Sequence, residues 1–313
     1  MLEILDPGTL TSVQDTRGRR AWRRYGVPQG GAADPWSARL ANRLVANSDD
    51  AAVLEVVGES AAIRIGVAAI VAVTGGLSTT VDGIPMPPDS ARRVAPGSRI
   101  RFGPGSGLRA YVSVGGGLHV EPVLGSSATD LRTGFGGLDG RALAAGDRIG
   151  IGRPDVTAQP RRWIGTRAAG PLRITAGPQA SGSTLRELTA AAWVVGAAAD
   201  RTGVRLEGAP LTGGDEVPSQ GLLTGAIQLP PDGLPILMLP DCPVTGGYRV
   251  PACIIGADLG RLAQLRPGDR LELVEVSLDE AREAGRGWES ELSATDEVDA
   301  SAADEPGWAG AHG

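Results

Sequence analysis

One pattern occurs three times along the chain, as APGSRIRFG (95–103), AAGDRIGIG (144–152) and RPGDRLELV (266–274). In each stretch a glycine suits a tight turn, and a polar residue and an arginine precede the alternating residues of a half-buried strand. The second and third stretches would each close a lobe of the chain. The repeat therefore predicts a mainly β protein with a few short helices, built as two similar β-barrel lobes.

Composition divides the chain into four segments. Short β-prone runs closed by glycine or proline fill residues 1–152, which we expect to form the first lobe. A Pro- and Arg-rich connection follows over 153–170, and the second lobe is expected over 171–278. Residues 279–313 contain ten acidic residues and two arginines. This composition predicts an acidic, disordered tail with at most one helical turn within 279–290.

Capping signals predict three short helices within the two lobes. Asp34 is a good N-cap for a helix that would begin at Pro35, and its apolar residues fall on one face. Thr184 and Glu187 have the spacing of a capping box at the start of a second helix. Asp258 is the expected N-cap of the third helix.

The supply of reactive side chains excludes several kinds of chemistry. All 30 basic residues are arginines, so the chain has no lysine for a Schiff base, a P-loop or a general base. His119 is the single histidine before the acidic tail. Cys242 and Cys253 are eleven residues apart without a CxxC motif. We therefore expect neither a metal site nor a disulfide framework.

Charge and hydropathy also limit the expected partners and location. The whole chain has a net charge of −6, whereas its tail alone carries −8, so the body is near neutral and lacks the basic patch of a nucleic-acid binder. No apolar run approaches the roughly 20 residues that cross a bilayer. The start of the chain, MLEILDPGTL, does not resemble a signal peptide. We expect a cytoplasmic protein without nucleic-acid or membrane partners.

The first candidate binding segment is GVPQGGAADP (26–35), which contains Gln29, Gly30 and Asp34. Backbone N–H groups before a helix could receive a carboxylate or a phosphate, helped by the helix dipole. The alternative interpretation is an ordinary loop that ends in a helix cap. Gln14, Asp15 and Arg17 precede this segment, and they indicate either a surface ion pair or further site residues.

Three phrases of the second lobe concentrate polar and glycine residues: ADRTGVRLEG (199–208), GAIQLPPDGLP (225–235) and LPDCPVTGGYRVP (239–251). Each phrase alone is typical of a structural turn, but together they favour a small-molecule site. Arginine forks suit carboxylates, and glycine loops suit oxyanions or phosphates. The candidate residues in these phrases are Arg201, Arg205, Gln228, Asp232, Asp241, Gly246, Gly247 and Tyr248.

At these phrases the sequence resembles a known family, that of the C subunit of bacterial 5-oxoprolinase, the KipA protein and the second half of biotin-dependent urea carboxyltransferases. The similarity covers about residues 1–278, in phrases such as LDPGTLTSVQDTRGR, GVPQGGAADPWSARLANRLVAN, VGGGLHVEPVLGSSATDLRTGFGGLDGRALAAGDRI, DRTGVRLEG and DCPVTGGY. The sequence departs from the family pattern at 241–249, DCPVTGGYR, at 199–202, ADRT, and at Leu234.

The resemblance implies two cyclophilin-like β-barrels and a function within a complex. Family members act beside a KipI-like B subunit, and an A subunit is also required for the ATP-dependent opening of 5-oxoproline (pyroglutamate) to glutamate. The leading hypothesis is therefore an ATP-dependent cyclic amide hydrolase subunit that is active only with its partners. Its cofactor would be ATP with Mg²⁺, shared with the partner subunit.

The hypothesis assigns a role to each group of candidate residues. Arg201 and Arg205 would bind the substrate carboxylate, and Gln228 would hydrogen-bond the ring amide. Asp232 or Asp241 would orient that amide or a magnesium ion. The glycine loop at 246–247 would face an oxyanion or a phosphoryl group.

Two other functions fit the same resemblance. The first is a biotin-dependent carboxyltransferase component of the urea carboxylase or allophanate type. Because the chain has no lysine, carboxybiotin would then arrive on another chain. The second is a non-catalytic regulator that binds a KipI-like partner.

Overall fold

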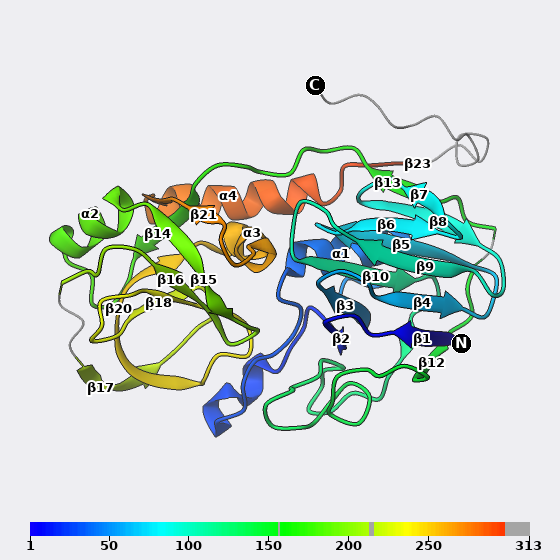
Figure 1. Ribbon diagram of the computed structural model, residues 1–313, viewed down its shortest axis with the longest axis horizontal. Coiled ribbons are helices and arrows are strands. Elements are labelled where there is room, and N and C mark those ends of the chain that lie inside the picture. Colours follow the sequence, from blue (N-terminus) through cyan, green and yellow to red (C-terminus); the bar gives the residue numbers. More distant parts are fainter. Residues whose placement is uncertain (156, 213–215, 298–313) are drawn as a thin grey trace.

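The computed structural model describes residues 1–155, 157–212 and 216–297, and within them two β-rich lobes lie side by side (Figure 1). The fold is mainly β with a few short helices, in two cyclophilin-like barrel lobes, as the sequence predicted. No helix of the described ranges is long and apolar enough to cross a membrane.

The first lobe is built from two sheets whose facing sides enclose one apolar core. One sheet has the order β11-β12-β1-β4-β9-β6-β7, with bounds Leu118–His119, Arg148–Ile151, Leu2–Asp6, Ala62–Ile65, Arg99–Gly103, Ser78–Val81 and Ile84–Met86. The other has the order β2-β3-β10-β5-β8-β13-β23, with bounds Leu10–Gln14, Val53–Val57, Arg109–Val114, Ala69–Gly75, Ser90–Val94, Arg161–Trp163 and Thr295–Glu297.

The second lobe is one strongly curved sheet around a core that includes Trp193. Its order is β21-β15-β16-β19-β18-β20-β14-β22, with β17 paired to β20. The bounds in that order are Arg270–Leu271, Trp193–Ala199, Gly203–Glu207, Ile236–Met238, Ala226–Leu229, Thr245–Ile254, Leu172–Ala176 and Leu273–Glu275, with Glu216–Gly221 for β17.

The repeated turn-and-strand pattern has one local cause in all three places. The turn glycines are left-handed, with φ of 93° at Gly97, 91° at Gly146 and 91° at Gly268. The polar residue after each glycine accepts a hydrogen bond from the backbone N–H three residues before it, at 3.2, 2.7 and 2.7 Å. A side chain on Cβ would strain each left-handed turn, which explains the recurring glycine.

The first predicted helix is confirmed. Helix α1 (Pro35–Leu44) begins after Asp34, whose Oδ1 accepts from the Ser37 backbone N–H at 2.9 Å. Its apolar side packs on β5 and β10 through Trp36, Leu40 and Leu44. Strand β5 is therefore covered on both faces, which explains its nearly unbroken apolar sequence AIVAVTG.

Two caps differ from the prediction. Helix α2 (Gly182–Ala190) is capped by Ser181, whose hydroxyl accepts from the Thr184 backbone N–H, so that Thr184 lies inside the helix. Helix α3 (Leu259–Gln264) follows the 3₁₀ turn η2 (Gly256–Asp258), and Asp258 makes no side-chain cap. Its carboxylate instead binds the backbone and guanidinium of Arg173 in β14.

The acidic segment from residue 279 is ordered as far as residue 297, contrary to our expectation. Helix α4 (Leu278–Glu291) begins with a capping box formed by Ser277 and Glu280. It runs along the top of the molecule from the second lobe to the first (Figure 1). The prediction failed because acidic side chains cover the solvent face of α4, while a few apolar residues suffice to dock it. Residues 298–313 lie outside the described ranges.

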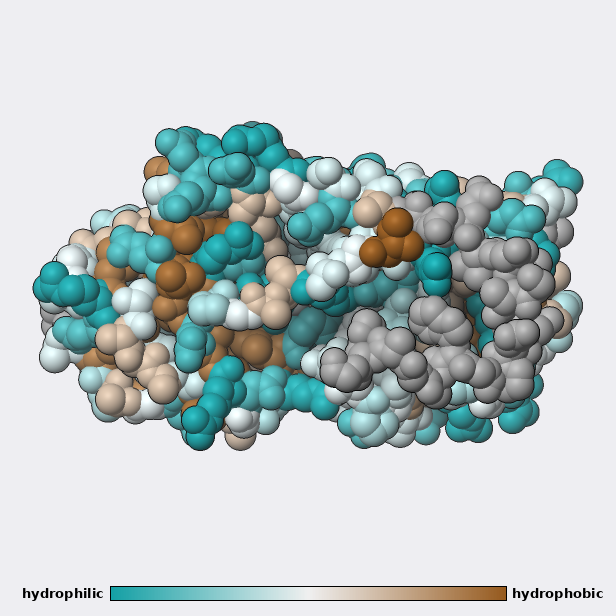
Figure 2. Space-filling model, turned by 90° about the horizontal axis from the view of Figure 1, so that it is seen from above, coloured by the Kyte–Doolittle hydropathy of each residue, from teal (hydrophilic) through white to brown (hydrophobic). Residues whose placement is uncertain are grey.

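The end of α4 is anchored on the first lobe. Leu292 is completely buried beside Trp163 and Trp36. The indole N–H of Trp163 donates to the Glu291 carbonyl at 2.8 Å, and β23 pairs with β13. Seen from above, apolar surface is exposed between hydrophilic side chains over the second-lobe half of the molecule (Figure 2). The segment after residue 278 thus joins the two lobes.

Candidate functional site

A buried ion cluster joins the two lobes around Arg201. This residue lies between β15 and β16 of the second lobe and is 5% exposed. Its Nε and Nη2 donate to the Asp241 carboxylate at 2.8 and 2.9 Å, and Nη1 donates to Glu55 of β3 in the first lobe. Nη2 also donates to the Gly31 carbonyl at 2.7 Å. Every guanidinium nitrogen of Arg201 therefore has a protein acceptor.

The cluster continues through the first lobe from Glu55. The Tyr111 hydroxyl donates to Glu55 at 2.8 Å and accepts from the Asp34 backbone N–H at 2.8 Å. The Ala33 backbone N–H also donates to Glu55, at 2.8 Å. Arg109 lies 3.7 Å from the same carboxylate. Two arginines thus balance the charges of Glu55 and Asp241, as a buried site requires.

Protonation follows from this pairing. Burial favours the neutral form of Arg201, but the charges of Glu55 and Asp241 outweigh it and raise the pKa of Arg201. Burial likewise opposes ionisation of Glu55, yet Arg201 and Arg109 hold its pKa below the usual value. Burial and the charge of Glu55 raise the pKa of Tyr111 well above its usual value. Glu55 and Arg201 are therefore a charged pair, and Tyr111 is a neutral donor.

Two predicted site residues take structural positions in this cluster. The structure gives Arg201 protein partners in place of the substrate carboxylate that we expected. Asp241 is the bidentate partner of Arg201, and burial raises its pKa although Arg201 opposes this. Arg205 and Asp232 do come together, at 2.7 Å, but as a pair on the surface whose side chains are 38% and 48% exposed.

A second group of predicted residues lies around Gln228 in β18. Gln228 is 5% exposed, and its Nε2 has no hydrogen-bond partner among the described residues. A Cβ on Gly246 would lie 2.6 Å from that Nε2 and 2.7 Å from Leu222, so glycine leaves space beside the amide. Gly246 and Gly247 belong to β20 and lack left-handed backbone, so they form no phosphate-binding turn.

Arg23 completes this group from the 3₁₀ helix η1 (Arg20–Tyr25). Its Nη2 donates to the Leu222 carbonyl, whereas its buried Nη1 has no partner in the described part of the chain. Burial raises the pKa of the neighbouring Cys242 thiol, and Arg23 opposes this. Arg23 thus contacts the Leu222 carbonyl, and the Leu222 side chain borders the space beside Gln228 Nε2. The two unused donors, Arg23 Nη1 and Gln228 Nε2, are of the kind that suits a carboxylate or another oxyanion.

The remaining predicted residues have smaller roles in the structure. The Gly30 N–H donates to the Pro240 carbonyl at 3.1 Å, and the Gln29 carbonyl accepts from the Arg19 N–H at 2.7 Å. The first bond joins the loop before α1 to the second lobe, and the second closes that loop on itself. Tyr248 is half-buried in β20, where its carbonyl accepts from Gln220. No anion-binding nest is left at Gly30, because its N–H is already used.

The residues noted before this loop separate in the structure. Arg17 pairs with Asp50 at the surface, as one of our two interpretations expected. Asp15 is buried and accepts from Gly18 N–H and from the Ser126 hydroxyl, both at 2.8 Å. It thereby ties the chain before η1 to the loop after β11.

Sequence reasoning missed Glu55, Arg19 and Asp130. Glu55 carried a signal, since it is the one charged residue of the apolar strand VLEVV, where a buried charge implies a partner. Arg19 and Asp130 are each 1% exposed, although both stand in polar loop sequences that are usually at the surface. Their burial depends on contacts between segments more than 100 residues apart.

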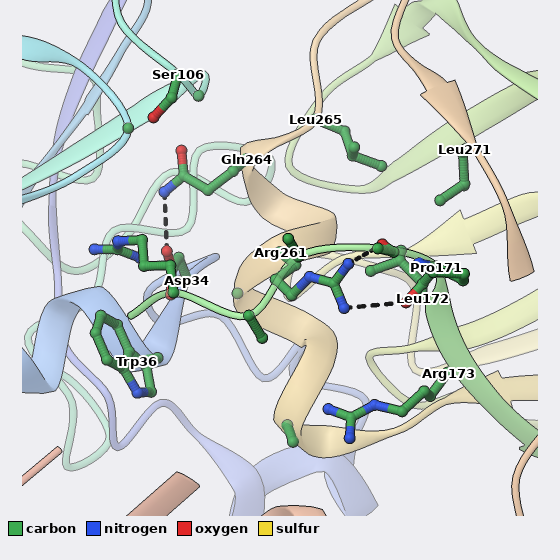
Figure 3. A pocket seen from close by; sticks show the side chains of 18 of the residues that line it. Asp34, Trp36, Ser106, Pro171, Leu172, Arg173, Arg261, Gln264, Leu265 and Leu271 are labelled. Carbon is green, nitrogen blue, oxygen red and sulfur yellow. Dashed lines mark hydrogen bonds between the residues drawn. The ribbon is translucent and has the colours of Figure 1, made fainter. Parts of the chain in front are cut away.

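A cavity of about 820 Å³ also lies at the lobe junction, between α1, α3, α4 and the segment 167–173. Figure 3 shows Asp34 and Trp36 on one wall, with Gln264 pointing to Asp34. Gln264 donates to Asp34 at 2.9 Å, and Arg261 donates to the backbone of the connecting segment, at 3.1 Å to Pro171. Asp34 is the single predicted site residue that lines this cavity.

The cavity is a weaker candidate for polar chemistry than the group around η1. Its Arg173 is paired with Asp258 at 2.7 Å, and its Arg167 is paired with Asp89 and stacked on Trp36. A ligand would have to displace these bonds, whereas Gln228 and Arg23 offer unused donors. We therefore place the candidate site where η1 meets the second lobe, and we treat the cavity between α1, α3 and α4 as secondary.

Bound Mg²⁺ and ATP do not fit the described residues of this chain. No group of three or more acidic, histidine or cysteine side chains lies together as metal ligands within the described ranges. The expected glycine loop is a strand, and the Gly30 N–H is occupied. We therefore assign no step to a metal or nucleotide held by this chain.

The comparisons with known proteins agree along almost the whole chain. The family model "Carboxyltransferase domain, subdomain A and B" matches residues 25–275. The chain is 36% identical to the C subunit of 5-oxoprolinase from Escherichia coli, over 91% of this chain and 94% of that protein. It is 31% identical to urea amidolyase of Saccharomyces cerevisiae, over 90% of this chain but 17% of that protein.

Solved structures show the same fold. The urea carboxylase of Kluyveromyces lactis superposes with a TM-score of 0.85 at 29% identity, over 93% of this chain and 29% of that protein. The chain therefore matches nearly the full length of one component of one enzyme and a single section of much longer enzymes.

Proposed function

The chain belongs to the carboxyltransferase-domain family that includes the C subunit of 5-oxoprolinase, and from this premise we propose that it is part of a cytoplasmic, ATP-dependent 5-oxoprolinase complex. The observation that carries the proposal is the 36% identity, which spans 94% of the Escherichia coli protein. The partners would be a KipI-like B subunit and an A subunit. The assembly would add water across the lactam C–N bond of 5-oxoproline and release glutamate.

The site supports this substrate through its donors. 5-Oxoproline carries one carboxylate and one ring amide. We assign the carboxylate to Arg23 Nη1 and Gln228 Nε2, which are the unused donors around Leu222. This changes the role that the sequence suggested for Gln228 from amide to carboxylate binding, and it replaces Arg201 by Arg23. Charge-assisted hydrogen bonds from such donors orient the lactam for attack.

Carboxyl transfer is the second candidate function, because the matching family model and the urea carboxylase structure both carry that chemistry in their names. In that reaction carboxybiotin would come from another chain. The third, regulatory function predicts binding of a KipI-like partner without turnover of either substrate.

The test is ATP-dependent release of glutamate from 5-oxoproline by the chain combined with its two partner subunits. We expect glutamate only from the complete complex and none from the chain alone, since the chain matches a single subunit of that enzyme. Two controls omit ATP and omit this chain. A complete complex that carboxylates urea from carboxybiotin and releases no glutamate from 5-oxoproline would establish the second function instead.

A further inference from the structure

Three buried polar atoms on the first-lobe side of η1 have no hydrogen-bond partner among the described residues. They are Gln14 Oε1, Arg19 Nη1 and Asp130 Oδ2. Their residues are 0%, 1% and 1% exposed. Buried polar groups in proteins are nearly always paired, so three such atoms in one region require an explanation.

Arg19 is held rigidly with one nitrogen left over. Its Nε donates to the Val123 carbonyl at 3.0 Å, and its Nη2 donates to the Ala128 carbonyl at 2.6 Å. The ring of Phe135 lies 4.6 Å from the guanidinium carbon. The remaining Nη1 stands beside Gly30, where a Cβ would lie 3.5 Å away. The guanidinium of Arg19 is thus fixed by its hydrogen bonds and by the ring of Phe135, and its Nη1 points toward the lobe junction.

Asp130 and Gln14 are fixed in the same way, each with one oxygen left over. Asp130 Oδ1 accepts from the backbone N–H groups of Arg132 and Thr133, at 3.0 and 3.1 Å. Gln14 Nε2 donates to the Ser12 hydroxyl at 3.0 Å and to the Thr129 carbonyl at 3.3 Å. Gln14 contacts Thr129, which directly precedes Asp130 in the chain. The two residues that carry the unused acceptors therefore lie next to the same loop.

Asp130 and two further aspartates interact with the charge of Arg19 without direct contact. Burial lowers the pKa of Arg19, and the charges of Asp15, Asp130 and Asp241 oppose this. No carboxylate of the described residues lies within 4.0 Å of its nitrogens. Arginine stays protonated at any ordinary pH, so this buried cation has Asp130 as a neighbouring carboxylate without forming an ion pair with it. A small ligand with both a hydrogen-bond donor and an acceptor would supply partners for Arg19 Nη1 and Asp130 Oδ2.

We propose that Gln14, Arg19 and Asp130 bind the amide of the substrate, recognised as a carbonyl with an N–H group on the same edge. The carbonyl oxygen accepts from Arg19 Nη1, and the N–H donates to Asp130 Oδ2. Gln14 Oε1 accepts a further N–H where the ligand has one. Lactams and ureas share this cis-amide edge. The inference rests on the proposed function, for which it supplies the amide end of the binding site.

Both sets of unused atoms include an arginine at or next to η1. Arg19 precedes the first residue of η1, and Arg23 lies within this short helix. Arg19 turns to the first-lobe loop, and Arg23 turns to Leu222 of the second lobe. Asp241 interacts with Arg19, and the next residue, Cys242, contacts Arg23. The amide end and the carboxylate end are therefore linked through η1 and through the adjacent residues Asp241 and Cys242.

The first test uses Asp130→Asn in the assembled complex. Asparagine keeps the oxygen that accepts from the two backbone N–H groups, so the turn is preserved, but it replaces the unused acceptor by a donor. We expect the KM for 5-oxoproline to rise about tenfold to hundredfold, as for loss of a charged hydrogen bond. An unchanged KM and kcat would overturn the proposal.

Asp200→Asn is the matched control. Asp200 Oδ1 makes the same turn, accepting from the backbone N–H groups of Thr202 and Gly203 at 2.7 and 3.1 Å. This turn lies in the second lobe, whereas the three unused atoms belong to residues of the first. The control variant should keep the KM of the wild type. An equal rise of KM in both variants would show that the turn, rather than the unused oxygen, matters.

A binding experiment without ATP separates this proposal from the proposed function. Ligand-observed NMR on the complex would use 2-pyrrolidone, a lactam without a carboxylate, and urea. We expect the wild type to bind at least one of them, and Asp130→Asn to bind it at least tenfold more weakly. Equal binding by both proteins, or no binding of either probe to the wild type, would overturn the amide site.

The two probes also distinguish the ligand classes. Gln14→Leu removes Oε1, so it should weaken urea, which has a further N–H edge, more than 2-pyrrolidone. If the wild-type complex releases no glutamate but binds urea through Asp130, the proposed function fails while the amide site stands. If glutamate is released and Asp130→Asn changes neither KM nor probe binding, the amide site fails while the proposed function stands.

Discussion

Two buried arginines at the lobe junction stand in opposite situations. Arg201 is 5% exposed and donates from all three of its nitrogens to Glu55, Asp241 and the Gly31 carbonyl. Arg19 is 1% exposed, donates to backbone carbonyls only, and keeps one nitrogen unused. Neighbouring carboxylates raise the pKa of Arg201, whereas burial lowers that of Arg19.

The difference separates a structural charge from one that is available to a ligand. Arg201 and its carboxylates neutralise one another, so the cluster joins the lobes and has little to offer a substrate. Arg19 is fixed by contacts that do not neutralise it, and its nearest acidic groups stay beyond direct reach. A buried charge without a counter-charge is costly unless something else completes it. A substrate that carries an amide would do so.

The largest fall in the free energy of unfolding should follow removal of the Arg201 charge. Arg201→Met leaves Glu55 and Asp241 buried beside each other without their shared cation. We expect the free energy of unfolding to fall by about 3–5 kcal/mol, as for a broken buried ion pair. Denaturant unfolding monitored by circular dichroism measures it. A loss of unfolding free energy below about 1 kcal/mol would contradict the structural role of Arg201. Arg201 and Arg19 would then no longer differ in the way described above.

The second prediction concerns the segment that covers the junction. Leu292 follows α4 and is fully buried against the first lobe. Leu292→Ala should lower the free energy of unfolding by about 2–4 kcal/mol through the lost packing and the cavity it leaves. Leu278→Ala is a suitable control, because Leu278 is 62% exposed at the other end of α4. Equal stability of the two variants would instead favour the disordered tail that the sequence predicted.

The third prediction concerns the pH dependence of stability. Asp49 pairs with Arg39 and Arg43 in a cluster that is more exposed than that of Arg201. Hydrogen bonds and charges from Arg43 and Arg39 lower the pKa of Asp49 from 3.8 to about 2. A carboxyl whose pKa is lowered by folding stabilises the protein above its unfolded pKa, and this contribution is lost as pH falls toward the folded value. Between pH 4 and pH 2 the wild type should therefore lose stability more steeply than Asp49→Asn. Parallel pH profiles would contradict this prediction.

The smallest effect is expected for the surface arginine of the same sequence phrase. Arg205 pairs with Asp232, and both side chains are more than a third exposed. Arg205→Ala should change the free energy of unfolding by no more than about 1 kcal/mol, as is usual for surface pairs. Comparison with Arg201→Met by the same denaturant titration would show that two arginines four residues apart differ through burial alone. A loss comparable to that of Arg201→Met would remove this distinction.

The sequence predicted the parts of the fold that depend on local chemistry. The glycine turns at 97, 146 and 268 and the Asp34 cap follow from backbone conformation and short-range hydrogen bonds. The site depends on contacts that no local pattern reveals. Arg201 meets Glu55 from 146 residues away, and Arg19 meets Ala128 from 109 residues away. The second-lobe phrases therefore indicated relevant residues, but their partners and roles required the structure.

The acidic segment shows a related limit. Its average composition predicted disorder, yet docking depends on single residues such as Trp288 and Leu292 rather than on the average. A capping box at Ser277 and Glu280 was present in the sequence and marked the start of α4. That local signal was the better guide to residues 278–291.

The most direct test of the contrast between the two arginine centres is the dissociation constant of 5-oxoproline for the assembled complex, measured by calorimetry without ATP. We predict that Asp130→Asn, which alters the centre of Arg19, raises it tenfold or more while the unfolding free energy stays within about 1 kcal/mol of the wild type. Arg205→Ala should leave the constant unchanged. An unchanged constant in Asp130→Asn, or the same weakening in Arg205→Ala, would contradict the account.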